Sequence, residues 1–392
     1  MNLFRPSSAL ALLLPLTLLA ACGDSDTTRP TTPPATAAPT TPLPTTPPAG
    51  TASPASAAPT APTAPASPGS TPDAPATAAP TSIAPDTFPV TIEHKYGTTT
   101  IDAKPERIVV VGFAEHEGLL AIGAEPVAVR DWYGDQPYAT WPWAQDELGD
   151  LTPEVIPAEA LNFEQIAALR PDVVLGISSG MTDADYATLS AIAPTIAQPG
   201  EYVDYGVPWD VALTIDARAI GRSAEAAQVI AETKALFAAV REEHPEWAGL
   251  TAGVTYLYES QPGGYSSQDP RARFLAELGL ATPSVYDAVA GDQFWFTVSG
   301  EEVATLDADA IVWLGDGEAA IQAIRDLPLR NTLTAFAEGR EILADSLLAG
   351  AFSHASPLSY PYVIEHLVSE LELALDGDPA TAVPSAAQIA PG

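Results

Sequence analysis

The sequence predicts an α/β fold of two lobes, each built on a parallel sheet with helices on both faces, with one long helix joining them. Short apolar strands alternate with amphipathic helices in two separate stretches of the chain, and this alternation is typical of parallel sheets covered by helices. Between these stretches, residues 211–243 keep apolar side chains at helical spacing, with Gly221 as the weak point. A helix of about 30 residues would span on the order of 45 Å.

The first lobe takes its elements from residues 107–196. β-Branched and apolar residues run together in its strands, and Asn162 can cap one of its helices. We expect strands at 107–112, 126–129, 154–156, 172–177 and 194–196, and helices at 114–122, 163–169 and 183–192.

The second lobe begins after His244-Pro245, where proline ends the long helical pattern. The alternation of strands and helices then resumes, and Gly279 closes the first of the helices. We expect strands at 251–258, 310–314 and 341–344, and helices at 271–278, 318–326 and 360–375.

The start of the chain has the features of a secretory signal, since Arg5 precedes a short apolar core at residues 9–21 with small residues at its end. This core is shorter than the roughly 20 residues that a membrane-spanning helix needs. It closes with Leu19-Ala20-Ala21-Cys22, which contains the only cysteine of the chain. These four residues resemble the bacterial lipobox, which implies cleavage before Cys22 and lipidation of Cys22. An ordinary signal with a chance cysteine is the alternative.

Residues 23–85 consist almost wholly of Thr, Pro, Ala and Ser, a composition that cannot bury a core. We expect a tether that reaches on the order of 100 Å if largely extended; a tail without a role and a glycan-bearing stalk are the alternatives. The predicted segments are a lipoprotein signal peptide (1–22), a disordered tether (23–85), an N-terminal α/β lobe (86–208), a spine helix (209–246), a C-terminal α/β lobe (247–376) and a disordered tail (377–392).

The formal net charge is −34. Nucleic-acid binding needs clustered Lys and Arg, and adhesion to anionic lipid needs a basic surface, so this charge argues against both. We interpret the acidity as a contribution to solubility, which leaves room for a local basic pocket.

Several phrases of the folded part occur in an order that resembles one family. They are residues 103–109, 119–129, 161–175, 299–303 followed by 306–312, and 356–359. Over most of residues 86–376 the chain is similar to the substrate-binding proteins of ABC importers for ferric siderophores, haem and cobalamin. Trp141-Pro142-Trp143, Leu148-Gly149-Asp150 and Pro208-Trp209 resemble the iron–siderophore branch. The resemblance implies two Rossmann-like lobes joined by one long rigid helix, the class III periplasmic-binding-protein type.

The resemblance also implies two surface carboxylates that pair with arginines of a permease dimer, one on each lobe. The matching positions are Glu164 and Glu301, with Glu302 as an alternative to the latter. Two carboxylates at a fixed separation would set orientation through charge-assisted bonds to Arg. The alternative for both is a simple helix N-terminal charge, which the helix dipole favours.

The ligand is expected where loops leave the carboxyl ends of the strands, at the face between the lobes. Aromatic walls suit a large iron chelate, and Arg130, Arg271 and Arg273 would suit an anionic one. Trp313, inside an apolar strand, is expected in the core instead. The predicted ligand-binding residues are Phe113, His116, Tyr133, Trp141, Trp143, Ser178, Ser179, Tyr205, Trp209, Tyr265, Arg271, Arg273, Trp295 and His354.

No metal site is predicted, because the five histidines lack the spacing of metal ligands. A siderophore already saturates its iron, so no cofactor is expected either, whereas haem would use an axial His or Tyr. One enzyme signal is present: Gly176-Ile177-Ser178-Ser179-Gly180 fits the pattern of a hydrolase nucleophile elbow. The sequence lacks the glycine-rich oxyanion motif of such hydrolases, which argues against an esterase.

The predicted function is therefore that of an extracytoplasmic solute-binding lipoprotein, not an enzyme, that captures a ferric siderophore and delivers it to an ABC permease dimer. We expect a monomer that meets the membrane only through its lipid anchor and binds no nucleic acid. Haem or cobalamin binding within the same family is the alternative, and a secreted serine esterase using Ser178 is a remote one.

Overall fold

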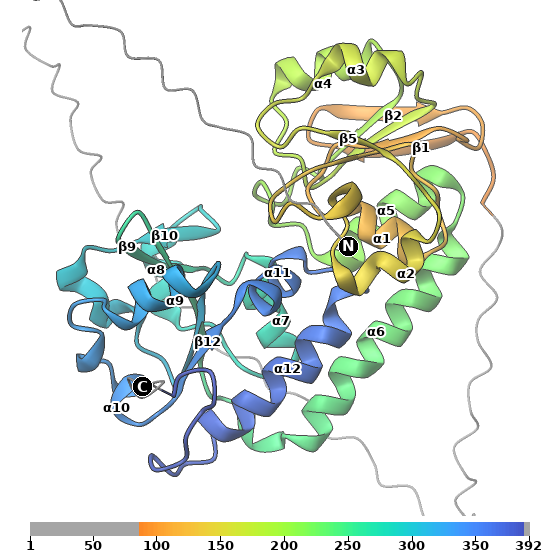
Figure 1. The fold of residues 1–392 in the computed structure, drawn as a ribbon. Coiled ribbons are helices and arrows are strands. Elements are labelled where there is room, and N and C mark those ends of the chain that lie inside the picture. Colours follow the sequence, from red (N-terminus) through yellow and green to blue (C-terminus); the bar gives the residue numbers. More distant parts are fainter. Residues whose placement is uncertain (1–85, 388–392) are drawn as a thin grey trace, which may run out of the picture. The chain divides into compact units, whose positions relative to one another are not determined.

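The computed structural model describes residues 86–387, which are coloured in Figure 1. Cys22, the signal segment and the tether at 23–85 lie outside the described residues, as do residues 388–392. Within residues 86–387, no helix combines the length and the apolar character that crossing a bilayer requires.

The first lobe contains a five-stranded sheet in the order β5-β4-β3-β6-β7, with all strands parallel. An antiparallel hairpin that the sequence did not reveal precedes it, formed by β1 (Val90–His94) and β2 (Gly97–Ile101). The sheet strands are β3 (Ile108–Val110), β4 (Ala128–Arg130), β5 (Glu154–Ile156), β6 (Val173–Gly176) and β7 (Thr195–Ala197). The helices are α1 (Glu115–Ala121), η1 (Pro137–Ala139), η2 (Pro142–Ala144), α2 (Gln145–Leu148), α3 (Phe163–Ala168) and α4 (Asp183–Ser190).

The second lobe has a mixed sheet in the order β10-β9-β8-β11-β12. The strands β8 (Ala252–Tyr258), β11 (Ala310–Leu314) and β12 (Glu341–Ala344) are parallel, whereas β9 (Gln261–Tyr265) and β10 (Trp295–Thr297) add an antiparallel edge. Its helices are η3 (Pro245–Trp247), α7 (Pro270–Glu277), α8 (Ser284–Ala290), η4 (Gly300–Leu306), α9 (Glu318–Arg325), η5 (Arg330–Thr332), α10 (Thr334–Ala337), α11 (Ser346–His354) and α12 (Ser359–Ala374).

The long helical stretch between the lobes is divided at one glycine. α5 (Trp209–Ile220) ends at Gly221, whose φ of +71° stops the helix, and α6 (Ser223–Glu243) starts two residues later. The single helix expected over residues 211–243 is therefore two helices, because Gly221 adopts the left-handed conformation that glycine tolerates best.

The longer helix α6 joins the lobes, as Figure 1 shows beside α12. Ala226 near its start is part of the first-lobe core, whereas Phe237 and Val240 near its end belong to the second-lobe core. One rigid helix of about 30 Å thus contributes to both cores. The predicted fold class, two Rossmann-like lobes joined by a long helix, is confirmed.

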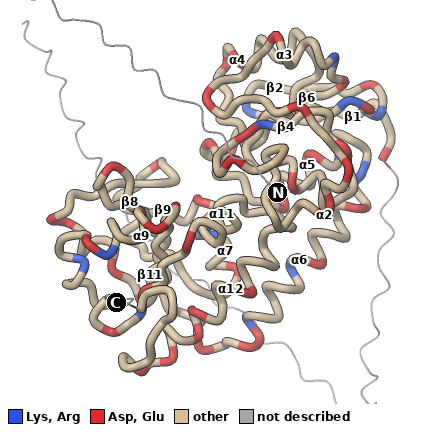
Figure 2. The backbone as a smooth tube through the Cα atoms, in the orientation of Figure 1, with Lys and Arg blue, Asp and Glu red and all other residues tan. Residues whose placement is uncertain are grey.

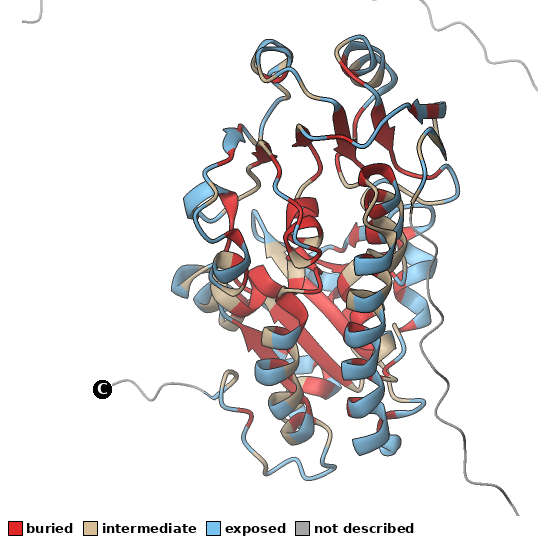
Figure 3. Cartoon of the chain, turned by 90° about the vertical axis from the view of Figure 1, so that its right-hand side faces the viewer, coloured by how far each residue is buried: buried red, intermediate tan, exposed pale blue. Residues whose placement is uncertain are grey.

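Both sheets are buried beneath their helices, as the red strands of Figure 3 show. Trp313 on β11 lies in the core with no exposed surface, as expected, and its indole Nε1 donates to Glu341 at 2.7 Å. Acidic residues are spread over both lobes in Figure 2.

The end of the second lobe corrects one prediction. Residues 377–387 were expected to be a disordered tail, but Val383 is only 3% exposed and packs in the second-lobe core. The Ser385 hydroxyl donates to Glu370 and accepts from the backbone N–H of Leu343 at 3.0 Å. The segment folds back because packing Val383 into the second-lobe core removes its apolar surface from water.

Candidate ligand-binding site

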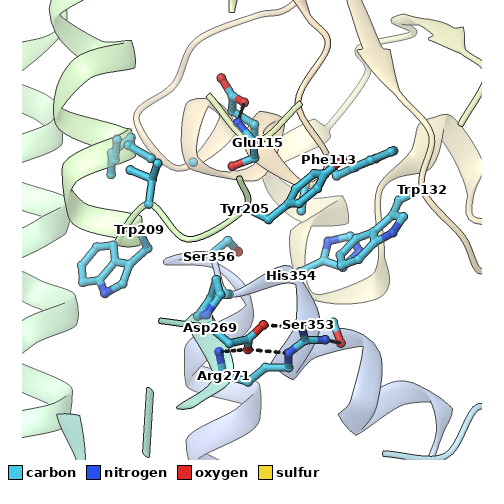
Figure 4. A pocket seen from close by; sticks show the side chains of 18 of the residues that line it. Phe113, Glu115, Trp132, Tyr205, Trp209, Asp269, Arg271, Ser353, His354 and Ser356 are labelled. Carbon is cyan, nitrogen blue, oxygen red and sulfur yellow. Dashed lines mark hydrogen bonds and ion pairs between the residues drawn. The ribbon is translucent and has the colours of Figure 1, made fainter. Parts of the chain in front are cut away.

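A cavity of about 340 Å³ lies between the lobes and takes its walls from both. Figure 4 shows Glu115, Phe113 and Tyr205 of the first lobe opposite Asp269, Arg271 and Ser353 of the second. The first-lobe walls follow the carboxyl ends of β3, β4 and β6, which is the edge of a parallel sheet where ligands bind. The aromatic residues that line it are Phe113, Trp132, Tyr205, Trp209 and Phe294.

The aromatic rings form a connected wall. The ring of Phe113 stacks on Trp132 at a centroid distance of 5.7 Å and on Tyr205 at 6.1 Å. Tyr205 in turn meets Phe294 of the second lobe edge-on at 5.8 Å. Such rings offer a broad, stiff apolar surface at little cost in conformational entropy.

One guanidinium lines the opposite wall. The Arg271 side chain donates from Nε to Oδ1 of Asp269 at 2.8 Å and from Nη2 to Oδ2 at 2.6 Å, and from Nη1 to Ser353 at 3.2 Å. It also stacks on Tyr265 at 3.7 Å. Asp269 additionally caps α7 by accepting from the Arg271 backbone N–H at 2.9 Å. The guanidinium is therefore fixed in place and its charge is matched by a buried carboxylate.

A pair of buried carboxyl groups lies on the first-lobe side. Oε1 of Glu115 accepts from the Ile177 backbone N–H at 3.1 Å, and Oε2 accepts from Ser178 at 2.8 Å. Gly112 permits this position, since a Cβ there would lie 1.7 Å from Oε2. Asp216 of α5 lies beside Glu115, and both line the cavity.

Burial raises the pKa of both members of this pair. For Glu115 the hydrogen bonds from the two backbone N–H groups oppose the effect of burial without cancelling it. For Asp216 the negative charge of Glu115 adds to the effect of burial. Two carboxyl groups this close do not both ionise readily, which is why the pKa of Asp216 rises beside Glu115.

A further buried carboxylate, Glu117, links the lobes beside the cavity. Glu117 of α1 accepts from His354 Nδ1 at 2.7 Å and from the Ser356 hydroxyl at 2.5 Å, both on the second lobe. It also accepts from Trp143 Nε1 at 2.9 Å. Burial would raise the pKa of Glu117, but the positive charge and hydrogen bond of His354, with Ser356, hold it below its ordinary value. The Glu117 carboxylate thus connects the two lobes through its hydrogen bonds to His354 and Ser356.

The comparison with known families decides where this chain belongs. The family model described as periplasmic binding protein matches residues 108–347, which span most of both lobes. The chain belongs to the periplasmic binding protein family.

Other members of the family resemble this binding protein over most of their length. A periplasmic solute binding protein from Mycobacterium smegmatis is 34% identical, with a TM-score of 0.65 over 73% of this chain and 98% of its own. PiaA of Streptococcus pneumoniae TIGR4, solved in complex with ferrichrome, is 30% identical, with a TM-score of 0.64 over 74% of this chain and 99% of its own. The probable siderophore-binding lipoprotein YfiY of Bacillus subtilis is 29% identical over 57% of this chain and 68% of its own.

The structure brings six of the predicted ligand-binding residues of this binding protein into the cavity wall. They come from five loops or helix ends along the sequence. These residues are Phe113, Ser178, Tyr205, Trp209, Arg271 and His354. Their contact with a ligand stays a prediction.

The other eight lie outside the cavity wall, and most have a structural partner. Trp141 stacks on Trp143 at 5.0 Å, and Gly350 leaves room for Trp141, so these rings fill the contact between the lobes. Tyr133 packs edge-on against Trp141, and Tyr265 lies beneath Arg271. His116 is buried, with its Nε2 3.4 Å from the Thr140 hydroxyl, and the Ser179 hydroxyl donates to Gly176 O at 2.6 Å. The guanidinium of Arg273 lies over the ring of Tyr202, and Trp295 on β10 is 42% exposed.

Sequence reasoning missed the acidic part of the wall. Asp269 carried a usable signal, because an Asp directly before Pro270 is typical of a helix cap followed by proline at the first helical position. Glu115 and Asp216 carried none, since a carboxylate on a helix is ordinarily interpreted as a surface residue. Their burial depends on contacts with β3, β6 and α5 that only the fold creates.

The two carboxylates expected to meet a permease are exposed on different lobes. Glu164 is in the first turn of α3, and Glu301 is at the start of η4. Glu302, the alternative to Glu301, closes a capping box by accepting from the Ser299 hydroxyl at 2.8 Å. Glu302 therefore has an internal role, and docking through Glu301 stays a prediction.

The structure does not place Ser178 in a nucleophile elbow. The backbone of such a serine is strained, but Ser178 does not have a positive φ, and α4 begins only at Asp183. Among residues 86–387, no histidine is hydrogen-bonded to Ser178, and no three His, Cys, Asp or Glu side chains converge as a metal site.

Proposed function

We propose that this protein captures a ferric siderophore outside the cytoplasm and delivers it, chemically unchanged, to an ABC permease. The observation that carries the proposal is the inter-lobe cavity, whose aromatic walls and few fixed polar groups suit a bulky small molecule. Two relatives support the class of ligand. YfiY is a probable siderophore-binding lipoprotein, and PiaA was solved with ferrichrome.

Iron would enter and leave inside its chelate, so the protein needs no resident cofactor and performs no catalysis. The aromatic wall would contact the organic shell of the chelate, and the unused N–H groups of Arg271 would donate to its oxygen atoms. Since α6 contributes to both cores, we expect only small movements between the lobes and a largely preformed cavity.

The motif that ends at Cys22 and two exposed carboxylates support the proposed location and partners. Lipid on Cys22 would anchor the protein to the outer face of the membrane, with residues 23–85 as the tether. Glu164 and Glu301 would pair with basic residues of a permease dimer, one from each lobe. We expect the protein to act as a monomer until it meets the permease.

Fluorescence titration of the purified protein tests the ligand class, because Trp132 and Trp209 line the cavity. Ferric siderophores should quench tryptophan emission with saturation at one equivalent, and the chelate extracted afterwards should be intact by mass spectrometry. Haemin and cobalamin form the second arm of the panel. Haem has one observation in its favour, the buried Nε2 of His354, which lacks a partner among the described residues. Saturable binding of haemin with a shifted Soret band, and no binding of ferric siderophores, would contradict the proposal.

A further inference from the structure

The charged groups of the cavity wall are mostly acidic. Three carboxyl groups line it, from Glu115, Asp216 and Asp269, whereas Arg271 is its one Lys or Arg among the described residues. The two other arginines that the sequence offered as anion ligands are not part of the cavity wall, although the guanidinium of Arg130 stacks on the cavity-lining ring of Phe113 at 4.0 Å. Arg130 donates to backbone carbonyl groups, including Ala158 O at 2.8 Å, and Arg273 donates from Nε to Gln268 O at 3.1 Å.

The charge of Arg271 is not available to a ligand. The fully buried carboxylate of Asp269 accepts hydrogen bonds from two N–H groups of Arg271, one to each oxygen. A third N–H group of Arg271 donates to the Ser353 hydroxyl. His354 is likewise matched by Glu117. This end of the cavity therefore offers a ligand hydrogen-bond donors, but each positively charged side chain there is neutralised by a carboxylate.

The acid pair at the other end has the opposite character. Both oxygens of Glu115 already accept from backbone N–H groups. Asp216 is only 2% exposed, and its buried Oδ1 accepts no hydrogen bond from an N–H or hydroxyl group of residues 86–387. A buried acceptor without a donor is costly, and a donor on the ligand would remove that cost.

Building on the proposed function, we propose that this cavity selects ferric chelates that are neutral or carry one pendant ammonium group, which Asp216 with Glu115 binds, and disfavours polyanionic chelates. Three hydroxamates neutralise Fe³⁺, so a ferric trihydroxamate is uncharged, and one with a protonated terminal amine carries a single positive charge. Three catecholates leave a ferric complex with three negative charges. Such a trianion would lose its hydration in a cavity whose wall, among residues 86–387, contains no Lys or Arg without a carboxylate partner.

The unmodified protein provides the decisive test. The probes are the ferric complex of a linear trihydroxamate with a primary amine, the same complex with that amine acetylated, and a ferric tricatecholate, titrated at pH 7 and constant ionic strength. The amine and its acetylated form differ only in the pendant charge. We expect the amine form to bind about tenfold tighter than the acetylated form, and both to bind at least about a hundredfold tighter than the tricatecholate.

Replacing Asp216 isolates the contribution of the pair. Asp216→Asn should abolish the preference for the amine while leaving the affinity for the acetylated complex within about twofold, and Asp146→Asn, an exposed site on α2, should change neither. If Asp216→Asn does not fold, the comparison of the two trihydroxamates on the unmodified protein still decides. Tighter binding of the tricatecholate, or equal binding of the amine and acetylated forms, would overturn the inference while leaving the proposed function intact. Failure of every ferric siderophore to bind would instead overturn the proposed function.

Discussion

Replacing Glu117 by Gln should weaken the contact between the lobes more than any change at an exposed carboxylate. In the native protein this buried carboxylate accepts from His354, Ser356 and Trp143. The amide of Gln offers one oxygen to these donors and turns an NH₂ group toward at least one of them. One buried donor is then left without an acceptor, and His354 loses the negative charge of the Glu117 carboxylate as its partner.

The magnitude follows from the size of the folded part. Removing one partner of a buried ion pair costs roughly 3–5 kcal/mol, and the low end applies because the Gln oxygen still accepts. About 300 residues are folded, and unfolding entropy is about 2.1 cal/mol/K per residue, so a loss of about 3 kcal/mol lowers Tm by about 5 °C.

Differential scanning calorimetry of the purified Glu117→Gln variant at pH 7 measures this shift, and Glu125→Gln, at an exposed site, is the matched control. The pKa of Glu117 is held below its ordinary 4.5, so its contribution is fully present above pH 4.5 and is lost as the pH falls through the lowered value. The difference between the native protein and the variant should therefore shrink below about pH 4. A Tm within 1 °C of the native value at pH 7 would refute the role given to this cluster.

Three further outcomes are expected. The pKa of the buried His116 is lowered from 6.5 to about 4, mainly by burial. As the pH falls, the unfolded chain is therefore protonated at this histidine before the native protein is. The free energy of unfolding should decrease by up to about 3 kcal/mol between pH 6.5 and 4. Urea unfolding over this range should show a smaller loss for His116→Gln, and an equal loss in both would count against that assignment. Tyr205→Ala should weaken siderophore binding about tenfold to a hundredfold by calorimetry, because a cavity-lining ring is lost, whereas Trp295→Ala, outside the cavity wall, should bind like the native protein. The double variant Glu164→Arg, Glu301→Arg should keep siderophore affinity and lose uptake of iron-55 by cells, and native uptake would show that the permease is met elsewhere.

The parallel part of the fold was predictable because its strands are apolar runs bounded by glycine, as at β3 and β6. The antiparallel edge of the second lobe was not. β9 has the sequence Gln-Pro-Gly-Gly-Tyr, which has the composition of a turn. It is a strand because Gly263 and Gly264 leave space for the ring of Tyr256, the backbone of β10 and the ring of Phe296. That packing is visible only once the sheet is assembled.

The candidate site was predictable in its aromatic half. Residues such as Phe113 and Ser178 directly follow predicted strands, and the carboxyl ends of parallel strands meet at one edge. The sequence could not separate aromatic residues of the cavity wall from those that fill the contact between the lobes, such as Trp141. It also gave no sign of the acid pair, since Gly112 must lie beneath Glu115 before that carboxylate can be buried.

The central claim is that this protein holds an iron chelate between its lobes and releases it unaltered. Isothermal titration of the purified protein with a ferric trihydroxamate, followed by recovery of the ligand and mass spectrometry, tests it most directly. We predict one binding site with a Kd of about 1 μM or below, weakened by Tyr205→Ala, and a recovered chelate of unchanged mass. Heat of binding that is absent, or a ligand recovered in cleaved form, would contradict the account.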